Sequence, residues 1–161
     1  MKNSLEKRVA AILDSKKIIV IATAGKDGQP WNTPVAGFRF SGDLDFYWTS
    51  WSENQHSKNI RANKHVFIVV FNEESAEGVY FVAEASEIVD EQEALAAAKV
   101  FGNDKYNSSD GREYLGDKPR RIYKAVPKQA WMNSDKKDKN GKFIHDFRIE
   151  IDLKSLRTSV K

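Results

Sequence analysis

The sequence contains no cysteine and no hydrophobic run long enough to cross a membrane. Without cysteine, disulfides, thiolate metal ligands and cysteine nucleophiles are excluded. No apolar stretch approaches the roughly 20 residues that a transmembrane helix needs. The first ten residues, MKNSLEKRVA, lack the apolar core of a signal peptide. We therefore expect a cytoplasmic protein that does not bind a membrane.

Patterns of catalytic or metal-binding residues are also missing. The three histidines, His56, His65 and His145, do not have the spacing of metal ligands, so no metal site is expected. The sequence shows no acid–base pair and no nucleophile triad. If the protein is an enzyme, no residue pattern in the sequence argues against a bound cofactor as the source of its chemistry.

The charge distribution bears on the kind of ligand. The net charge is +3 and the isoelectric point is about 9.0, which raises the question of nucleic-acid binding. Lys and Arg, however, are interleaved with Asp and Glu along most of the chain. The densest basic run, residues 136–142, surrounds Asn140 and Gly141 and is typical of a solvated hairpin tip. We expect a small anionic ligand rather than nucleic acid.

The length of 161 residues is sufficient for one domain, which we expect to span residues 1–161. A helix is predicted at about residues 4–14, because Asn3 and Glu6 form a capping-box pattern. About seven short strands follow within residues 17–153, and most are joined by hairpins. Successive strands with few intervening helices predict a mainly β (α+β) fold, an antiparallel barrel of six to seven strands with peripheral helices.

The strand predicted at residues 29–40 contains two prolines. Pro30 and Pro34 cannot donate to a β-ladder, so this strand must lie at a sheet edge or be bulged. Between them, Trp31-Asn32-Thr33 is polar and aromatic where a core strand would be apolar. Two interpretations remain open. The segment is either a twisted edge, or a strand whose free backbone groups and Thr33 face a ligand.

Further strands are predicted in the second half of the chain, at residues 78–89, 121–126, 129–133 and 143–153. Asp90 and Glu93 form a second capping box, which predicts the start of a helix. Pro127 separates the two middle strands, and the last strand is expected to close the sheet. The tail at residues 154–161 is expected to make few stabilising contacts with the rest of the protein.

The segment Asp45 to Phe71 carries the main functional signal. An aromatic strand ends in hydroxyl residues, and a polar loop, a short helix at residues 56–63 and a β-branched strand follow. Backbone N–H groups and the dipole at the start of such a helix can bind an anion, which predicts a phosphate clamp. Additional donors could come from Ser50, His56, Ser57 and Lys58. The alternative is an ordinary helical crossover with solvated polar residues.

Five motifs occur in a characteristic order: IVIATAGKDGQPWNTPV, LDFYWTS, QHSKNIRANKHVFIVV, GVYFVAEASEIVD and RRIYKAVPKQAWM. In this order and spacing they resemble the FMN-binding split barrels related to pyridoxamine 5′-phosphate oxidase. The resemblance covers about residues 18–153. It implies a six-stranded split β-barrel with Greek-key character. It also implies a homodimer that binds FMN in clefts at the subunit interface.

The resemblance assigns ten residues to the cofactor. It places Thr33, Pro34 and Val35 on the strand whose backbone faces the isoalloxazine ring. It places Thr49 and Ser50 at the end of the strand that approaches the ribityl chain and the phosphate. The phosphate position itself corresponds to Gln55, His56, Ser57 and Lys58. Trp131 matches a tryptophan that borders the flavin from the second subunit, although four tryptophans in a small domain more often serve packing.

The sequence departs from the oxidases at the phosphate position. Gln55 and His56 stand where the oxidases carry an Arg-Lys pair, so fixed positive charge is lost, and Lys58 and Arg61 are candidates to replace it. If His56 contributes charge, FMN binding should weaken as this residue loses its proton. His145 and Arg148 lie near the position of the oxidases' substrate-binding Arg and His, but strand-surface polarity is the favoured explanation. A vitamin B6 oxidase is therefore not expected.

The resemblance implies an FMN-dependent oxidoreductase that acts on an unidentified small molecule. A second hypothesis is a flavin-binding module that senses or stores FMN without turnover. A third is a split barrel that uses another cofactor, such as a deazaflavin or haem. For haem, His56 is the roughly placed axial ligand.

Overall fold

The computed structural model describes residues 5–102 and 107–160, so the predicted cap Asn3 lies outside the described residues. The strands are β1 (Ile18–Ala24), β2 (Pro30–Ala36), β3 (Arg39–Phe40), β4 (Phe46–Trp51), β5 (His65–Asn72), β6 (Glu77–Glu87), β7 (Arg120–Lys137) and β8 (Phe143–Glu150). The helices are α1 (Leu5–Ser15), α2 (Gln55–Ala62), α3 (Glu91–Phe101), α4 (Leu153–Ser159) and a 3₁₀ helix, η1 (Gly111–Tyr114).

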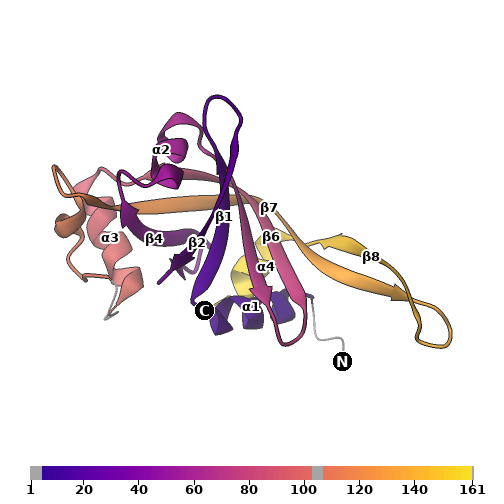
Figure 1. Cartoon of the computed structure of the whole chain (residues 1–161). Helices are drawn as coiled ribbons and strands as arrows, with labels where there is room; N and C mark the ends of the chain where they lie inside the picture. The colour runs from indigo at the N-terminus through magenta and orange to yellow at the C-terminus, as the bar shows by residue number, and fades with distance from the viewer. Residues whose placement is uncertain (1–4, 103–106, 161) are drawn as a thin grey trace.

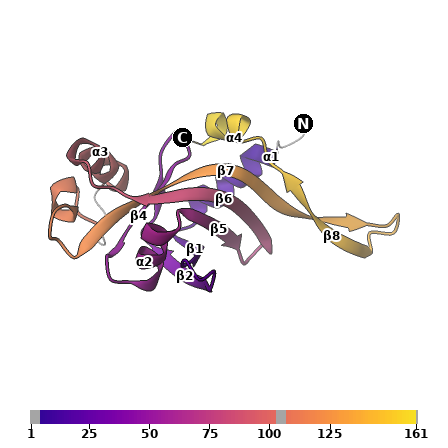
Figure 2. The ribbon, with the colours of Figure 1, turned by 90° about the horizontal axis from the view of Figure 1, so that it is seen from above.

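The strands form one antiparallel sheet in the order β2-β1-β5-β6-β7-β4-β3, and β8 pairs with β7 beside this path. The sheet is strongly curved but does not close, so β2 and β3 form its two edges. Figures 1 and 2 show α2 at one end of the curved sheet, α3 at its side, and α1 and α4 on the opposite end from α2. The predicted split-barrel fold is confirmed, with eight strands where six to seven were expected.

The strand predicted at residues 29–40 is divided in two. β2 lies at a sheet edge, which is one of the two arrangements that its prolines allowed, and it pairs with β1 along its whole length. The strand then breaks at Gly37, which has a positive φ of 71° and donates its N–H to Lys17 O at 3.0 Å. Glycine adopts this conformation without a steric penalty, so the chain can turn from β2 into β3 here.

The two strands predicted on either side of Pro127 are a single strand, β7, of 18 residues. Ala83 of β6 pairs with Pro127, whereas the preceding Val82 pairs with Gln129. Lys128 is therefore the extra residue of a β-bulge. The bulge accommodates a proline that cannot donate to the ladder, so the strand continues where two strands were predicted.

Two hydrophobic cores lie on opposite faces of β4 and β7. The main core fills the inside of the curved sheet, where Phe46 and Phe81 meet edge to face at 5.0 Å between ring centroids. The second core lies under α3 and includes Tyr47 and Ile122 from the other face of the same strands. Adjacent residues of β4, such as Phe46 and Tyr47, therefore point into different cores.

The prediction of an unsupported tail is wrong. Residues 153–159 form α4, and Asp152 accepts from the N–H groups of Lys154 and Ser155 at 3.2 and 3.1 Å. Leu156 is fully buried against the main core, and Val160 is 6% exposed. The spacing of these apolar residues after a capping Asp is the sequence signal for this helix.

β8 does not close the sheet as predicted. It pairs with β7 beyond the body of the fold, and the two strands form a projecting hairpin, residues 135–148, which we call the arm (Figure 1). Phe143, Ile144 and Phe147 on the arm are exposed. Among the described residues, no helix is both long enough and apolar enough to cross a bilayer.

Candidate cofactor site around helix α2

Helix α2 begins after a tight turn at the end of β4. The N–H of Asn54 donates to Trp51 O at 3.1 Å, which reverses the chain direction. Asn54 is the N-cap residue, but its side chain makes no capping bond and donates instead to Ser50 Oγ at 2.9 Å. The first turn of α2 contains no acidic residue. The positive end of the helix dipole thus lacks a capping side chain within this segment.

His56 is part of the interior of the protein. It is 4% exposed, and its Nε2 lies 2.8 Å from Ser50 Oγ. Burial lowers the pKa of His56 below its ordinary value, because the charged imidazole would lose hydration. The ring is therefore mainly neutral at neutral pH. The structure does not support the expectation that a charged His56 strengthens phosphate binding.

The other predicted residues of α2 differ in accessibility. Ser57 is fully buried and donates to the carbonyl of Trp51 at 2.8 Å. Lys58 is exposed, and its Nζ lies 3.2 Å from a carboxylate oxygen of Glu53. Gln55 is exposed at the start of the helix. Ser57 therefore fixes the helix to β4, while Gln55 and Lys58 remain accessible to a ligand.

Asn59 was not identified from the sequence, yet it joins α2 to β1. Its Nδ2 donates to Thr23 Oγ1 at 3.0 Å, and its Oδ1 accepts from Gln55 Nε2 at 2.9 Å. Asn59 and Thr23 are both buried. The spacing of four residues between Gln55 and Asn59 on one helix face was the available signal.

Thr49 and Ser50 point to opposite faces of β4. Ser50 faces the interior and contacts His56, as described above. Thr49 Oγ1 donates to Asn107 Oδ1 at 2.6 Å and accepts from Arg120, and Asn107 in turn donates to Gly37 O at 3.2 Å. The structure therefore brings Ser50 to α2, whereas the Thr49 hydroxyl ties β4 to the segment before η1.

The three predicted residues of β2 lie on the edge strand. Thr33 and Val35 are opposite Ile21 and Ile19 of β1, both of which face the main core. Thr33 Oγ1 is buried and has no hydrogen-bond partner among the described residues. Pro34 is exposed on the other face and has no N–H to donate. A buried hydroxyl without a partner is costly, so Thr33 has an unused hydrogen-bonding group at this edge.

Trp131 lies on a different surface, toward the opposite end of β6 from α2. In successive strand pairs, Val20 is opposite Val69, Val69 is opposite Tyr80, and Tyr80 is opposite Trp131. Directly opposed residues share a face, so these four side chains form a row on the outside of the curved sheet. We call this surface the outer sheet face; nearby Ile18 and Phe71 are 58% and 51% exposed.

The two residues that correspond roughly to the substrate position of the oxidases are both on the arm. Arg148 places its guanidinium carbon 4.3 Å from the centroid of the Tyr80 ring, beside Trp131. His145 is exposed, and its Nδ1 is 3.1 Å from the carbonyl of Asp146. Within one chain, neither residue lies on the strands or the helix that surround Ser50 and His56.

An ionic cluster adjoins the other side of α2. Arg61 Nη2 donates to Ser52 O at 2.8 Å, and its Nη1 lies 3.3 Å from Glu87 Oε2. Glu87 also accepts from Arg121 Nε at 3.0 Å and from Tyr123 OH at 3.3 Å. Burial, the largest influence, and the charge of Glu87 raise the pKa of Tyr123, while Ser57 acts in the opposite direction. Glu87 was not identified from the sequence, because it ends an ordinary alternating strand.

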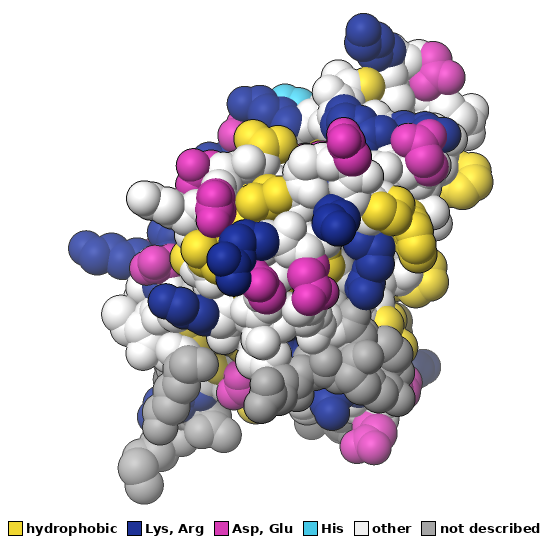
Figure 3. Space-filling view, turned by 90° about the vertical axis from the view of Figure 1, so that its left-hand side faces the viewer, with side chains coloured by type: hydrophobic (Ala, Val, Ile, Leu, Met, Phe, Trp, Pro, Cys, Tyr) yellow, Lys and Arg dark blue, Asp and Glu magenta, His cyan; other side chains and the backbone are white. Residues whose placement is uncertain are grey.

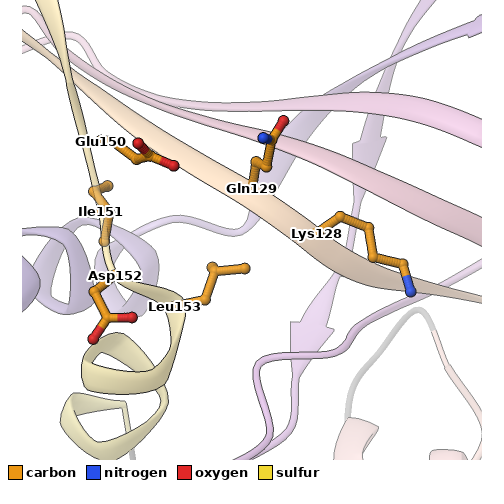
Figure 4. Close-up of a pocket in the computed structure, with 6 residues that line it drawn as sticks. All are labelled: Lys128, Gln129, Glu150, Ile151, Asp152 and Leu153. Carbon is orange, nitrogen blue, oxygen red and sulfur yellow. The ribbon is translucent and has the colours of Figure 1, made fainter.

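Other surface features do not coincide with this region. A hollow of about 490 Å³ lies between the β7 bulge and the start of α4 (Figure 4). Its lining residues are Lys128, Gln129, Glu150, Ile151, Asp152 and Leu153. On the α3 side of the molecule, Lys and Arg side chains lie beside Asp and Glu (Figure 3). The residues described here include no group of three potential metal ligands.

Comparison with known proteins places the chain in a family. A family model described as pyridoxamine 5′-phosphate oxidase matches residues 5–134. The chain belongs to the pyridoxamine 5′-phosphate oxidase family. The match ends immediately before the arm. Comparison with curated protein sequences gives no match.

Solved structures of similar fold include members of this family and a haem protein. A proposed pyridoxamine 5′-phosphate oxidase of Listeria innocua has a TM-score of 0.61 and 21% identity, with 79% of this chain and 96% of that chain covered. A Clostridium acetobutylicum protein related to general stress protein 26 has a TM-score of 0.63 and 13% identity, covering 97% and 99%. The haem storage protein HutZ of Vibrio cholerae has a TM-score of 0.65 and 19% identity, covering 78% and 91%. At these identities the similarity establishes the fold.

Proposed function

We propose that this member of the pyridoxamine 5′-phosphate oxidase family is a homodimeric FMN-binding flavoprotein and an oxidoreductase acting on a small molecule. The observation that carries the proposal is the uncapped N-terminus of α2, which lies next to the interior hydroxyl and histidine at the end of β4. Such a helix end attracts an anion through its free N–H groups and its dipole. The phosphate of FMN is an anion of this kind.

The residues of the region fit the parts of FMN. The first turn of α2, with Gln55 and Lys58 accessible beside it, would hold the phosphate. His56 and Ser57 would hold that turn against the end of β4, through their contacts with Ser50 and with the carbonyl of Trp51. On β2, the backbone groups of Thr33, Pro34 and Val35 at the open edge of the sheet would meet the polar edge of the ring.

The outer sheet face supports the homodimer. Exposed apolar side chains on neighbouring strands form a surface of the kind that soluble proteins usually cover with a partner. A second copy packed there would bring its Trp131 toward a cofactor bound at the interface, which is the role that the resemblance assigns to this residue. The two cofactor sites would then each contain residues from both subunits.

When bound, FMN supplies the transfer of hydride or electrons, and the chain binds and orients it and excludes water. The neutral, buried His56 holds no proton that it could readily give up at neutral pH, because burial lowers its pKa. The chain's own contribution is therefore positioning, through Ser50, Ser57 and the edge strand β2. Binding of FMN without turnover would use the same residues.

Haem is a second candidate, favoured by the similarity to the haem storage protein HutZ. His56 is poorly suited as an axial ligand, because it is buried and its Nε2 already contacts Ser50. The exposed His145 on the arm is the more accessible imidazole. A haem complex would therefore depend on the arm rather than on α2.

The visible absorption spectrum of the purified protein tests these proposals. After FMN or haem is added and excess is removed, we expect a retained and perturbed flavin spectrum and no haem band. A retained haem band that disappears in His145→Ala would support the second candidate instead. Sedimentation of the FMN-loaded protein should give the mass of a dimer, and oxidation of NAD(P)H would separate an enzyme from a binding module. Retention of neither cofactor would contradict both candidates.

A further inference from the structure

The positive charge for a phosphate at α2 needs a source other than His56. A phosphate dianion is bound most strongly by charge-assisted hydrogen bonds from fixed cations. His56 is buried in contact with Ser50 and is mainly neutral. The cationic side chains that α2 itself carries are Lys58 and Arg61. The ion pairs and the exposure of Lys58 and Arg61 differ, and this difference indicates which of the two is better placed to bind the phosphate.

Arg61 reaches back to the beginning of its own helix. It stands in the last turn of α2, but side chains on a helix tilt toward its N-terminus. Arg61 Nη2 donates to the carbonyl of Ser52 at 2.8 Å, and Ser52 belongs to the turn that leads into α2. The guanidinium is therefore next to the loop that precedes the uncapped helix end.

The counter-ion of Arg61 is shared. Glu87 places one carboxylate oxygen 3.3 Å from Arg61 and the other 3.0 Å from Arg121. One negative charge thus faces two positive charges. Arg121 also donates to the carbonyls of Tyr114, Gly116 and Lys118, so its position is fixed by the fold. Arg61 is 40% exposed at its side chain, against 15% for Arg121, and is the guanidinium with access to a ligand.

Lys58 is less suitable for the same task. Its ammonium lies 3.2 Å from Glu53, which is not shared with another cation in the ion pairs of the described residues. Both partners are largely exposed, with 47% and 80% of their side-chain surface accessible. An ammonium is a hydrated point charge, whereas a guanidinium matches two phosphate oxygens at once.

We propose that Arg61 is the residue that selects the phosphorylated flavin, by binding the phosphate of FMN from the side of the Ser52 turn. The proposal rests on the proposed function and names the source of its specificity. Arg61 replaces the fixed charge that this chain lacks at Gln55 and His56. On binding, its guanidinium exchanges part of its contact with Glu87 for the phosphate, while Arg121 retains Glu87. The ligand class is therefore a flavin that carries a phosphate monoester.

The test compares FMN with riboflavin, which has the same ring and ribityl chain but no phosphate. Dissociation constants are measured by quenching of flavin fluorescence for the wild type, Arg61→Ala, Arg61→Lys, Lys58→Ala and Lys64→Ala. We expect Arg61→Ala to weaken FMN binding about 10- to 100-fold and to leave riboflavin within about twofold. Arg61→Lys should recover part of the loss. Lys58→Ala should lose less than Arg61→Ala.

Lys64→Ala is the matched control, because Lys64 is an exposed cation three residues beyond Arg61 that pairs with Glu84 at 3.1 Å. It should keep the preference for FMN. Equal loss of both flavins in Arg61→Ala, or an unchanged preference for FMN, would overturn the assignment while leaving the proposed function intact. A wild type that binds neither flavin would overturn the proposed function, and the assignment with it. Unfolding curves without ligand confirm that each variant is folded.

Discussion

Helices α2 and α3 differ at their N-termini and in the residues that they bury. The N-cap residue of α3 is Asp90, whose side chain accepts from the N–H of Glu93 at 2.8 Å, and the first turn carries two acidic residues. The residues that α3 buries are apolar, namely Ala94, Ala97, Ala98 and Phe101. α2 has no side-chain cap and no acidic residue in its first turn, and it buries His56, Ser57, Asn59 and Ile60.

This difference separates a helix that completes a core from a helix for which we propose a ligand-binding role. α3 satisfies its own N-terminus and contributes through apolar burial. α2 is held by hydrogen bonds from its buried polar residues, and its N-terminal groups remain available. A stable fold does not require an uncapped helix end, so this end is where function is to be sought. The variants below are designed to break or to sharpen the contrast.

The largest effect is expected at the contact between α3 and η1. A Cβ on Gly111 would lie 2.2 Å from the carbonyl oxygen of Ala94, and this neighbour is backbone that cannot rotate away. Gly111→Ala should therefore lower the free energy of unfolding by about 3 kcal/mol. The affinity of the remaining folded protein for FMN should not change, because α2 does not take part in this contact.

Urea unfolding followed by circular dichroism measures this loss. Gly42→Ala is the control, since a Cβ there would meet nothing within 4 Å, and its effect should stay within about 0.5 kcal/mol. If Gly111→Ala unfolds like the wild type, the close packing of α3 against η1 is not required for its position.

A smaller effect is expected when α2 is made to resemble α3. Gln55→Glu places an acidic side chain in the first turn, and its attraction to the helix dipole is worth about 0.3–1 kcal/mol. The substitution also removes the donor to Asn59 Oδ1, so the net change in the stability of the protein without ligand should be small. The same charge would repel the phosphate, so FMN affinity should fall about tenfold while riboflavin affinity is unchanged. Titration of both flavins and urea unfolding measure the two effects.

Gln92→Glu provides the matched control on the first turn of α3. Because this turn already carries Glu91 and Glu93, the change in stability should be small, and FMN affinity should not change. If Gln55→Glu binds FMN as tightly as the wild type, the phosphate does not lie at the start of α2.

Much of the fold could be predicted because the local signals agreed with the tertiary structure. The prolines of β2 predicted an edge or bulged strand, and the alternation of β6 and the capping box at Asp90 predicted the elements that follow. The errors arose where long-range pairing decided the outcome. β6 keeps β7 continuous through Pro127 by means of a bulge, and burial of Leu156 against the main core stabilises the tail as α4.

The candidate site was harder to predict in detail. The segment was found correctly as a strand, a hydroxyl-rich end and a short helix, and the structure brings Ser50, His56 and Ser57 together. The sequence could not reveal that Thr49 faces the opposite core, because the strand register was not known. Nor could it reveal the burial of His56 or the pairing of Arg61 with Glu87, which depends on contacts between distant segments.

The buried polar face of α2 should also give the protein a specific dependence on pH. Burial lowers the pKa of His56 in the folded state, whereas in the unfolded chain it titrates near its ordinary value of about 6.5. Between these two values the unfolded chain binds more protons, so the stability rises with pH. The contribution of His56 is therefore complete above about pH 6.5 and is lost as the pH falls toward the folded-state pKa.

We expect the free energy of unfolding of the wild type to decrease as the pH falls below about 6.5, and His56→Gln to lack this part of the decrease. Urea unfolding at several pH values measures the difference between the two proteins, which removes the contribution of other titrating groups. His65→Gln, on the exposed start of β5, should retain the wild-type dependence. Parallel curves for the wild type and His56→Gln would mean that His56 is hydrated. α2 would then lack the buried polar face that distinguishes it from α3.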